Sequence, residues 1–179
     1  MSTRVEQYRS AVLTTANQLT ILRIVFVPVF IILLAYGEIG WALSTFVAAG
    51  ITDVLDGVIA RRFGQKTSIG AVLDPLADKL LMTSSILILS LPQMEFHNTI
   101  PRWLLIVVLM VGWRVFTPSP YGKASTALQV FTVLGVLYSN WQHVAVPQLN
   151  VLFYMTGLMT AFSGLHYLVR GLRHWQSHD

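Results

Sequence analysis

Four of the eight acidic residues of the chain stand at fixed spacing inside apolar sequence: Asp53, Asp56, Asp74 and Asp78. Clustered carboxylates in a low dielectric repel one another, and some would protonate without a nearby cation. Divalent cations remove this repulsion, and hard oxygen ligands suit Mg²⁺, Mn²⁺ or Ca²⁺. Four carboxylates are enough to bridge two metals about 4 Å apart, which stabilises displacement at phosphorus. The pattern therefore favours metal-dependent chemistry on a phosphate or pyrophosphate.

The residues between the two aspartate pairs suit the same ligand. Gly57 and Ala60 remove side-chain bulk one turn apart, so a large ligand can approach the backbone. Arg61 lies at the depth of the aspartates, where a guanidinium could hold a phosphate. Thr67 and Ser68 add hydroxyl groups in the adjoining polar segment. We expect this stretch to contact the phosphates.

Two other interpretations of the aspartates stay open from the residues alone. The carboxylates could form helix-end salt bridges with Arg61, Arg62 or Lys79, although this explains one aspartate better than four. They could also line a cation pathway, since charged residues in membrane sequence often mark one. Transport sites tend to lie near the bilayer midplane at broken helices. These aspartates are predicted near one end of their helices, which favours the phosphate site.

The composition predicts an all-α integral membrane protein. Hydrophobic residues make up 54% of the 179 residues and charged residues only 11%, against about 25% in soluble domains. A helix needs roughly 20 apolar residues to span a bilayer. Six apolar runs are candidate spans: Leu19–Ala35, Trp41–Ala60, Ile69–Leu91, Trp103–Phe116, Ser125–Trp141 and Val151–Val169. The fourth run has only 14 residues and is short for a crossing.

These runs predict a six-helix transmembrane catalytic domain over residues 17–170. Residues 1–16 form an N-terminal cytoplasmic or interfacial segment, and residues 171–179 form a cytoplasmic tail. Thr3 to Leu13 could be an interfacial helix or a disordered polar leader.

Basic residues predict which side of the membrane each end of a helix faces. Eleven of the twelve fall on the side of the two termini, and only Arg102 falls on the other: Arg4, Arg9, Arg23, Arg61, Arg62, Lys66, Lys79, Arg114, Lys123, Arg170 and Arg173. This asymmetry predicts that both termini are cytoplasmic. It indicates that the net charge of +4 serves to orient the chain in the membrane and to contact anionic lipid headgroups. It also argues against nucleic acid as a partner.

The topology places all four aspartates at the cytoplasmic ends of their helices. Asp53 and Asp56 are three residues apart, and Asp74 and Asp78 are four apart, so each pair shares a helix face. The second and third runs form a hairpin. We therefore expect the two pairs to face each other.

The motif resembles the signature of the CDP-alcohol phosphotransferases (CDP-alcohol phosphatidyltransferases). The string Asp-x2-Asp-Gly-x2-Ala-Arg-x8-Gly-x3-Asp-x3-Asp runs unbroken from Asp53 to Asp78 and fixes eight positions. Asn17–Arg23 resembles the start of the first span of bacterial members, and Gly122–Gln129 resembles the entry to the fifth span of the phosphatidylglycerophosphate synthase and cardiolipin synthase branches. Asp74-Pro75-Leu76-Ala77-Asp78-Lys79 is similar to the cardiolipin synthase and phosphatidylglycerophosphate synthase branches.

The resemblance implies a membrane enzyme of phospholipid synthesis. Such an enzyme transfers a phosphatidyl group from CDP-diacylglycerol to an alcohol, releases CMP and uses two divalent cations, Mg²⁺ or Mn²⁺. It also implies a homodimer of six-helix subunits. We expect the bacterial inner (cell) membrane, with the active site facing the cytoplasm.

The resemblance also implies roles by position. The metal ligands are Asp53, Asp56, Asp74 and Asp78, and Asp78 is also the general base. The substrate-binding positions are Asn17, Thr20, Gly57, Ala60, Arg61, Thr67 and Gly70.

The acceptor is less defined than the donor. Arg114 and Lys123 could bind an anionic acceptor, or could be topological charge. Ala124 and Ser125 follow Lys123 where glycerol-phosphate enzymes tend to carry another basic residue, which favours phosphatidylglycerol over glycerol 3-phosphate. Arg23 and Lys79 could contact phosphate, although extension toward the headgroups is commoner. The alternative function is a non-catalytic or transport membrane protein that keeps the metal and nucleotide site.

Overall fold

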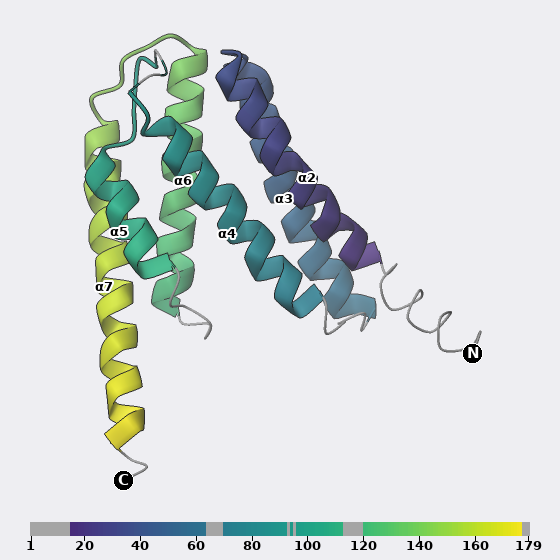
Figure 1. Ribbon diagram of the computed structural model, residues 1–179, viewed down its shortest axis with the longest axis vertical. Helices are drawn as coiled ribbons and strands as arrows, with labels where there is room; N and C mark the ends of the chain where they lie inside the picture. Colours follow the sequence, from purple (N-terminus) through teal and green to yellow (C-terminus); the bar gives the residue numbers. More distant parts are fainter. Residues whose placement is uncertain (1–14, 64–69, 93, 95, 113–119, 177–179) are drawn as a thin grey trace, which may run out of the picture. The chain divides into compact units, whose positions relative to one another are not determined.

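The computed structural model describes residues 15–63, 70–92, 94, 96–112 and 120–176. These residues form six helices and no strand (Figure 1). The helices are α2 (Thr15–Ala35), α3 (Ile39–Phe63), α4 (Gly70–Leu89), α5 (Arg102–Gly112), α6 (Pro120–Trp141) and α7 (Leu149–Gln176).

The six helices follow the six predicted apolar runs in order, so the all-α class is confirmed for the described residues. One of them, α2, contains an apolar stretch long enough to cross a membrane, Gln18–Ala35. Two other apolar stretches, Ile39–Leu55 and Arg102–Val111, are shorter. The possible interfacial helix at Thr3 to Leu13 lies outside the described residues. The division at residues 16 and 170 stays a prediction.

The chain divides into two compact units, residues 1–84 and 85–179, and the boundary falls within α4. In the first unit α2 packs along α3. Gly37, with φ of +75°, ends α2 in a left-handed conformation that favours glycine. Its N–H donates to the Leu34 carbonyl at 3.1 Å, and the Glu38 N–H donates to the Leu33 carbonyl at 2.9 Å. This Schellman motif stops α2 and lets the chain turn back into α3.

In the second unit α7 packs against both α6 and α5. Two glycines of α7 let α5 approach closely, because an added Cβ at Gly157 would collide with the Trp103 ring and one at Gly164 with Val111. The described part of α5 has 11 residues and ends at Gly112, before the predicted end of the fourth run at Phe116. Residues 113–119 are outside the described structure.

Hydroxyl groups line the contact between α6 and α7. Ser125 and Thr160 share a hydrogen bond of 2.8 Å, and so do Thr132 and Thr156, about two turns farther along α6. Gln129 donates to both members of the first pair, at 3.3 and 3.2 Å. Hydroxyl pairs of this kind join helices where the surroundings offer no competing water. They fix the register of α6 on α7.

Candidate active site

The acidic motif lies on two helices of the first unit. Asp53 and Asp56 are on α3, and Asp74 and Asp78 are on α4. The helical backbone at both places puts each pair on one face, as the spacing predicts. The side chains of Asp56 and Asp74 lie outside the described atoms, so the geometry rests on Asp53 and Asp78.

Arg23 of α2 joins these two carboxylates. Its Nη2 lies 2.8 Å from Oδ1 of Asp53, and its Nη1 donates to Oδ1 of Asp78 at 3.0 Å. The Arg23 side chain is 1% exposed, and each aspartate side chain is 47% exposed. One acid from α3 and one from α4 therefore meet at a single cation. The expected approach of the two pairs is confirmed for these two members.

The position of Arg23 corrects the expectation that its side chain extends toward the headgroups. The side chain is buried instead. A charge removed from water needs an opposite charge and hydrogen-bond acceptors, and the two carboxylates supply both. Arg23 is also not among the salt-bridge partners that the sequence suggests for the aspartates, which are Arg61, Arg62 and Lys79. The missed signal was a lone arginine five residues inside an apolar run, which has to find an acidic partner.

Other predicted substrate contacts belong to the same helices. Thr20 is fully buried on α2, one turn before Arg23, and the backbone of Asn17 is one turn earlier. Gly57, Ala60 and Arg61 occupy the last two turns of α3, which follow Asp53 and Asp56.

The remaining predicted site residues belong partly to the first unit, partly to the second unit and partly to segments outside the described structure. Gly70 is the first residue of α4. Lys123 is exposed near the start of α6, in the second unit. Thr67 and Arg114 lie outside the described residues, and the side chains of Asn17, Ala60 and Arg61 lie outside the described atoms.

The donor chemistry fits a hard divalent cation. Asp53 and Asp78 offer carboxylate oxygens, the ligands that Mg²⁺ and Mn²⁺ prefer, and both already contact one cationic group. Within the described side chains no group of three or more acidic or histidine residues gathers around one point. Asp56 and Asp74 are the residues whose helix positions would complete such a set.

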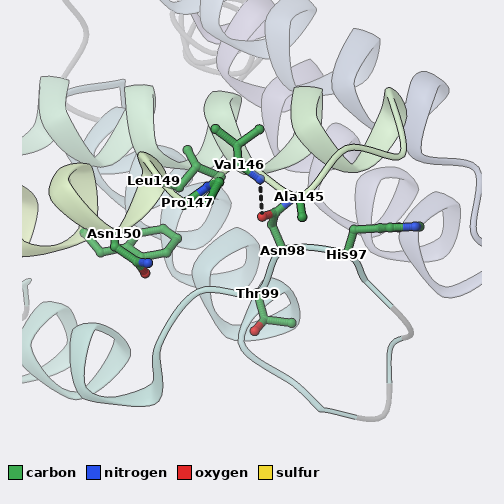
Figure 2. A pocket seen from close by; sticks show the side chains of 9 residues that line it. His97, Asn98, Thr99, Ala145, Val146, Pro147, Leu149 and Asn150 are labelled. Carbon is green, nitrogen blue, oxygen red and sulfur yellow. Dashed lines mark hydrogen bonds between the residues drawn. The ribbon is translucent and has the colours of Figure 1, made fainter.

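A separate hollow lies in the second unit, beside the segments that join α4 to α5 and α6 to α7 (Figure 2). It has a volume of about 290 Å³, and none of the predicted site residues lines it. Asn98 fastens the two segments: its Oδ1 accepts from the Val146 N–H at 3.1 Å, and its Nδ2 donates to the Val144 carbonyl at 2.7 Å. Asn140 exchanges two further hydrogen bonds of 2.8 Å with the Asn98 backbone. These hydrogen bonds join the two connecting segments beside the hollow, which is a structural role.

Comparison with known proteins gives a consistent result over most of the chain. The family model of the CDP-alcohol phosphatidyltransferases matches residues 13–163. A probable phosphatidylglycerophosphate synthase from Mycobacterium tuberculosis is 34% identical over 187 residues, covering 92% of this chain and 85% of that protein. A CDP-diacylglycerol–glycerol-3-phosphate 3-phosphatidyltransferase from Haemophilus influenzae is 31% identical over 167 residues, covering 84% and 89%.

A probable cardiolipin synthase (CMP-forming) from Drosophila melanogaster is 30% identical over 197 residues. The match covers 92% of this chain but 60% of the fly protein, so the chain spans less than two thirds of that relative. The matched family region contains the aspartate motif from Asp53 to Asp78 and also Arg23. The chain belongs to the CDP-alcohol phosphatidyltransferase family.

Proposed function

We propose that the protein transfers a phosphatidyl group from CDP-diacylglycerol to an alcohol acceptor, with release of CMP. The observation that carries this proposal is the approach of Asp53 and Asp78 to one cation, within an unbroken family motif. The four motif aspartates hold two divalent cations, Mg²⁺ or Mn²⁺. This choice follows the oxygen-only donor set.

The bound cations supply stabilisation of the charge that develops on the phosphoryl oxygens and on departing CMP. The protein's own residues do the rest. Asp78 takes the proton of the acceptor hydroxyl as that oxygen attacks the β-phosphorus of the CDP group. The oxygen–phosphorus bond to CMP breaks, and its electron pair leaves with CMP.

Substrate positioning falls to neighbours of the acids. Arg61 and Thr67 hold the phosphates, and Gly57, Ala60 and Gly70 leave room for the nucleotide. Asn17 and Thr20 of α2 line the same pocket; the position of Thr20 one turn before Arg23 supports this placement. Correct positioning matters because the donor and acceptor must meet in line at phosphorus.

The membrane arrangement is part of the proposal. Six helices cross the bilayer, both termini and the aspartates face the cytoplasm, and the subunits form a homodimer in the bacterial inner membrane. The asymmetric distribution of lysine and arginine supports this orientation. CDP would then approach from the cytoplasm, and the acyl chains would remain in the lipid.

The acceptor is phosphatidylglycerol or glycerol 3-phosphate. The relatives include proteins named for each product. Lys123 is exposed at the start of α6, where a cation could contact the phosphate of either acceptor, and Arg114 is proposed for the same role. Ala124 and Ser125 after Lys123 favour phosphatidylglycerol.

The test is CMP release by the purified full chain from CDP-diacylglycerol with Mg²⁺ or Mn²⁺. Phosphatidylglycerol and glycerol 3-phosphate are offered separately, and turnover with one of them names the branch. The matched variant is Asp78→Asn, which we expect to abolish turnover while CDP-diacylglycerol still binds. Full turnover in that variant would remove Asp78 from the base role. Metal and nucleotide binding without any CMP release would instead support a non-catalytic protein.

A further inference from the structure

We propose that Arg23 is a positioning residue for the metal site. Its guanidinium holds Asp53 of α3 and Asp78 of α4 at the separation at which the two carboxylates accept a divalent cation. This inference rests on the proposed function, because it takes the aspartates to be metal ligands. It adds a residue of α2 to a site otherwise built from α3 and α4.

The geometry of the contact supports a bridging role. Two different nitrogens of Arg23 reach two different carboxylates, at 2.8 and 3.0 Å. A guanidinium is planar and presents its donors in a rigid fork, so two simultaneous contacts fix the distance between their partners. Without it, the two negative charges would repel each other and separate.

The burial of Arg23 indicates that this contact persists when a metal binds. The side chain is 1% exposed, so its guanidinium group is removed from water. Moving it away from both carboxylates would give up two contacts that compensate its buried charge, which is unfavourable. The aspartates are each 47% exposed, so a cation from solvent can reach them while Arg23 stays behind them.

A competing role for Arg23 predicts the opposite change in metal affinity when Arg23 is removed. If Arg23 merely competed with the metal, its removal would leave a more negative site, and cations would bind more tightly. If Arg23 positions the ligands, its removal weakens binding despite the added negative charge. Losing an outer partner of a metal ligand typically costs roughly 10- to 100-fold in metal affinity.

The experiment measures Mn²⁺ binding to the full chain in detergent, from the free-Mn²⁺ signal in electron paramagnetic resonance, without substrate. Arg23→Gln removes the charge and the fork. Arg23→Lys keeps the charge but offers a single nitrogen, which cannot span both carboxylates in the same way. Lys79→Gln is the charge control, because it removes one positive charge beside Asp78 and leaves Arg23 in place.

We expect both Arg23 variants to bind Mn²⁺ roughly 10- to 100-fold more weakly than the wild type, and Lys79→Gln to bind at least as well as the wild type. Unchanged or tighter binding in Arg23→Gln would overturn the inference, and so would wild-type affinity in Arg23→Lys. If Arg23→Gln does not fold, Arg23→Lys decides the question. Absence of Mn²⁺ binding to the wild-type chain would instead refute the metal site of the proposed function.

Discussion

The close contact of α5 with α7 makes Gly164 a sensitive position. A Cβ added at Gly164 would lie 2.7 Å from Cγ2 and 3.0 Å from Cγ1 of Val111. Valine has one strongly preferred side-chain rotamer in a helix, so rotation of Val111 relieves little of this overlap. The Gly164→Ala substitution therefore has to push α5 away from α7.

The net effect of Gly164→Ala on stability is the difference between a gain in helix propensity and the cost of the packing overlap. Alanine in a helix interior is favoured over glycine by about 1 kcal/mol. An extra carbon in a packed contact costs about 1–3 kcal/mol, and the upper end applies here because two methyl groups are met at once. We expect Gly164→Ala to destabilise the protein by about 2 kcal/mol. For a chain of this size that corresponds to a fall in Tm of roughly 4–8 °C.

The assay is thermal unfolding of the purified chain in one detergent, with Gly50→Ala as the matched control. Gly50 lies in α3, and a Cβ there meets nothing within 4 Å, so the control gains helix propensity without a clash. Adding Val111→Ala to Gly164→Ala should recover part of the loss, because it removes the obstructing methyl groups. Equal stability of Gly164→Ala and Gly50→Ala would refute the packing argument.

Three further predictions concern other contacts. Asn140→Ala removes both hydrogen bonds to the Asn98 backbone, and we expect a loss of about 1–3 kcal/mol in unfolding free energy, measured by thermal unfolding. Thr156→Val removes the 2.8 Å hydrogen bond to Thr132 with little change in volume, and a smaller loss of about 0.6 kcal/mol is expected in the same assay. Arg61→Ala should raise the KM for CDP-diacylglycerol roughly tenfold or more, and an unchanged KM in the CMP-release assay would contradict its phosphate contact.

Helix positions could be predicted because apolar run length is a strong local signal. The order of the six helices follows it directly, and seven predicted helix ends match within two residues: 35, 41, 69, 91, 103, 141 and 151. The largest differences occur where polar residues continue a helix. The backbone of α7 remains helical to Gln176, beyond the apolar run that ends at Val169. The added residues include arginine, leucine and glutamine, which are good helix formers, and apolarity alone does not define a helix end.

The contacts of the site could be predicted only in part. Spacing within one helix fixes which face an aspartate occupies, so the two pairs were predictable. The identity of the cation between them depends on how α2 rotates against α3, and α2 is apolar on nearly every side. Periodicity therefore carries little information about the direction in which Arg23 points. Contacts between helices, such as Gly164 with Val111, are hidden for the same reason.

The division of the chain separates the residues proposed for the donor from those proposed for the acceptor. All four aspartates, Arg61 and Arg23 belong to residues 1–84, whereas Arg114 and Lys123 belong to residues 85–179. We therefore predict that replacing residues 85–179 with the matching segment of a relative that uses the other acceptor changes the preferred acceptor.

The CMP-release assay compares the two acceptors for the chimera and both parents, and Mn²⁺ binding reports whether the exchanged protein keeps its first unit intact. Because the proposed metal ligands and Arg23 are unchanged, Mn²⁺ affinity should stay at the parental value. An intact chimera that retained the original acceptor would show that residues 1–84 also select the alcohol. The acceptor would then be chosen beside the aspartates, and Lys123 would be left with its topological role.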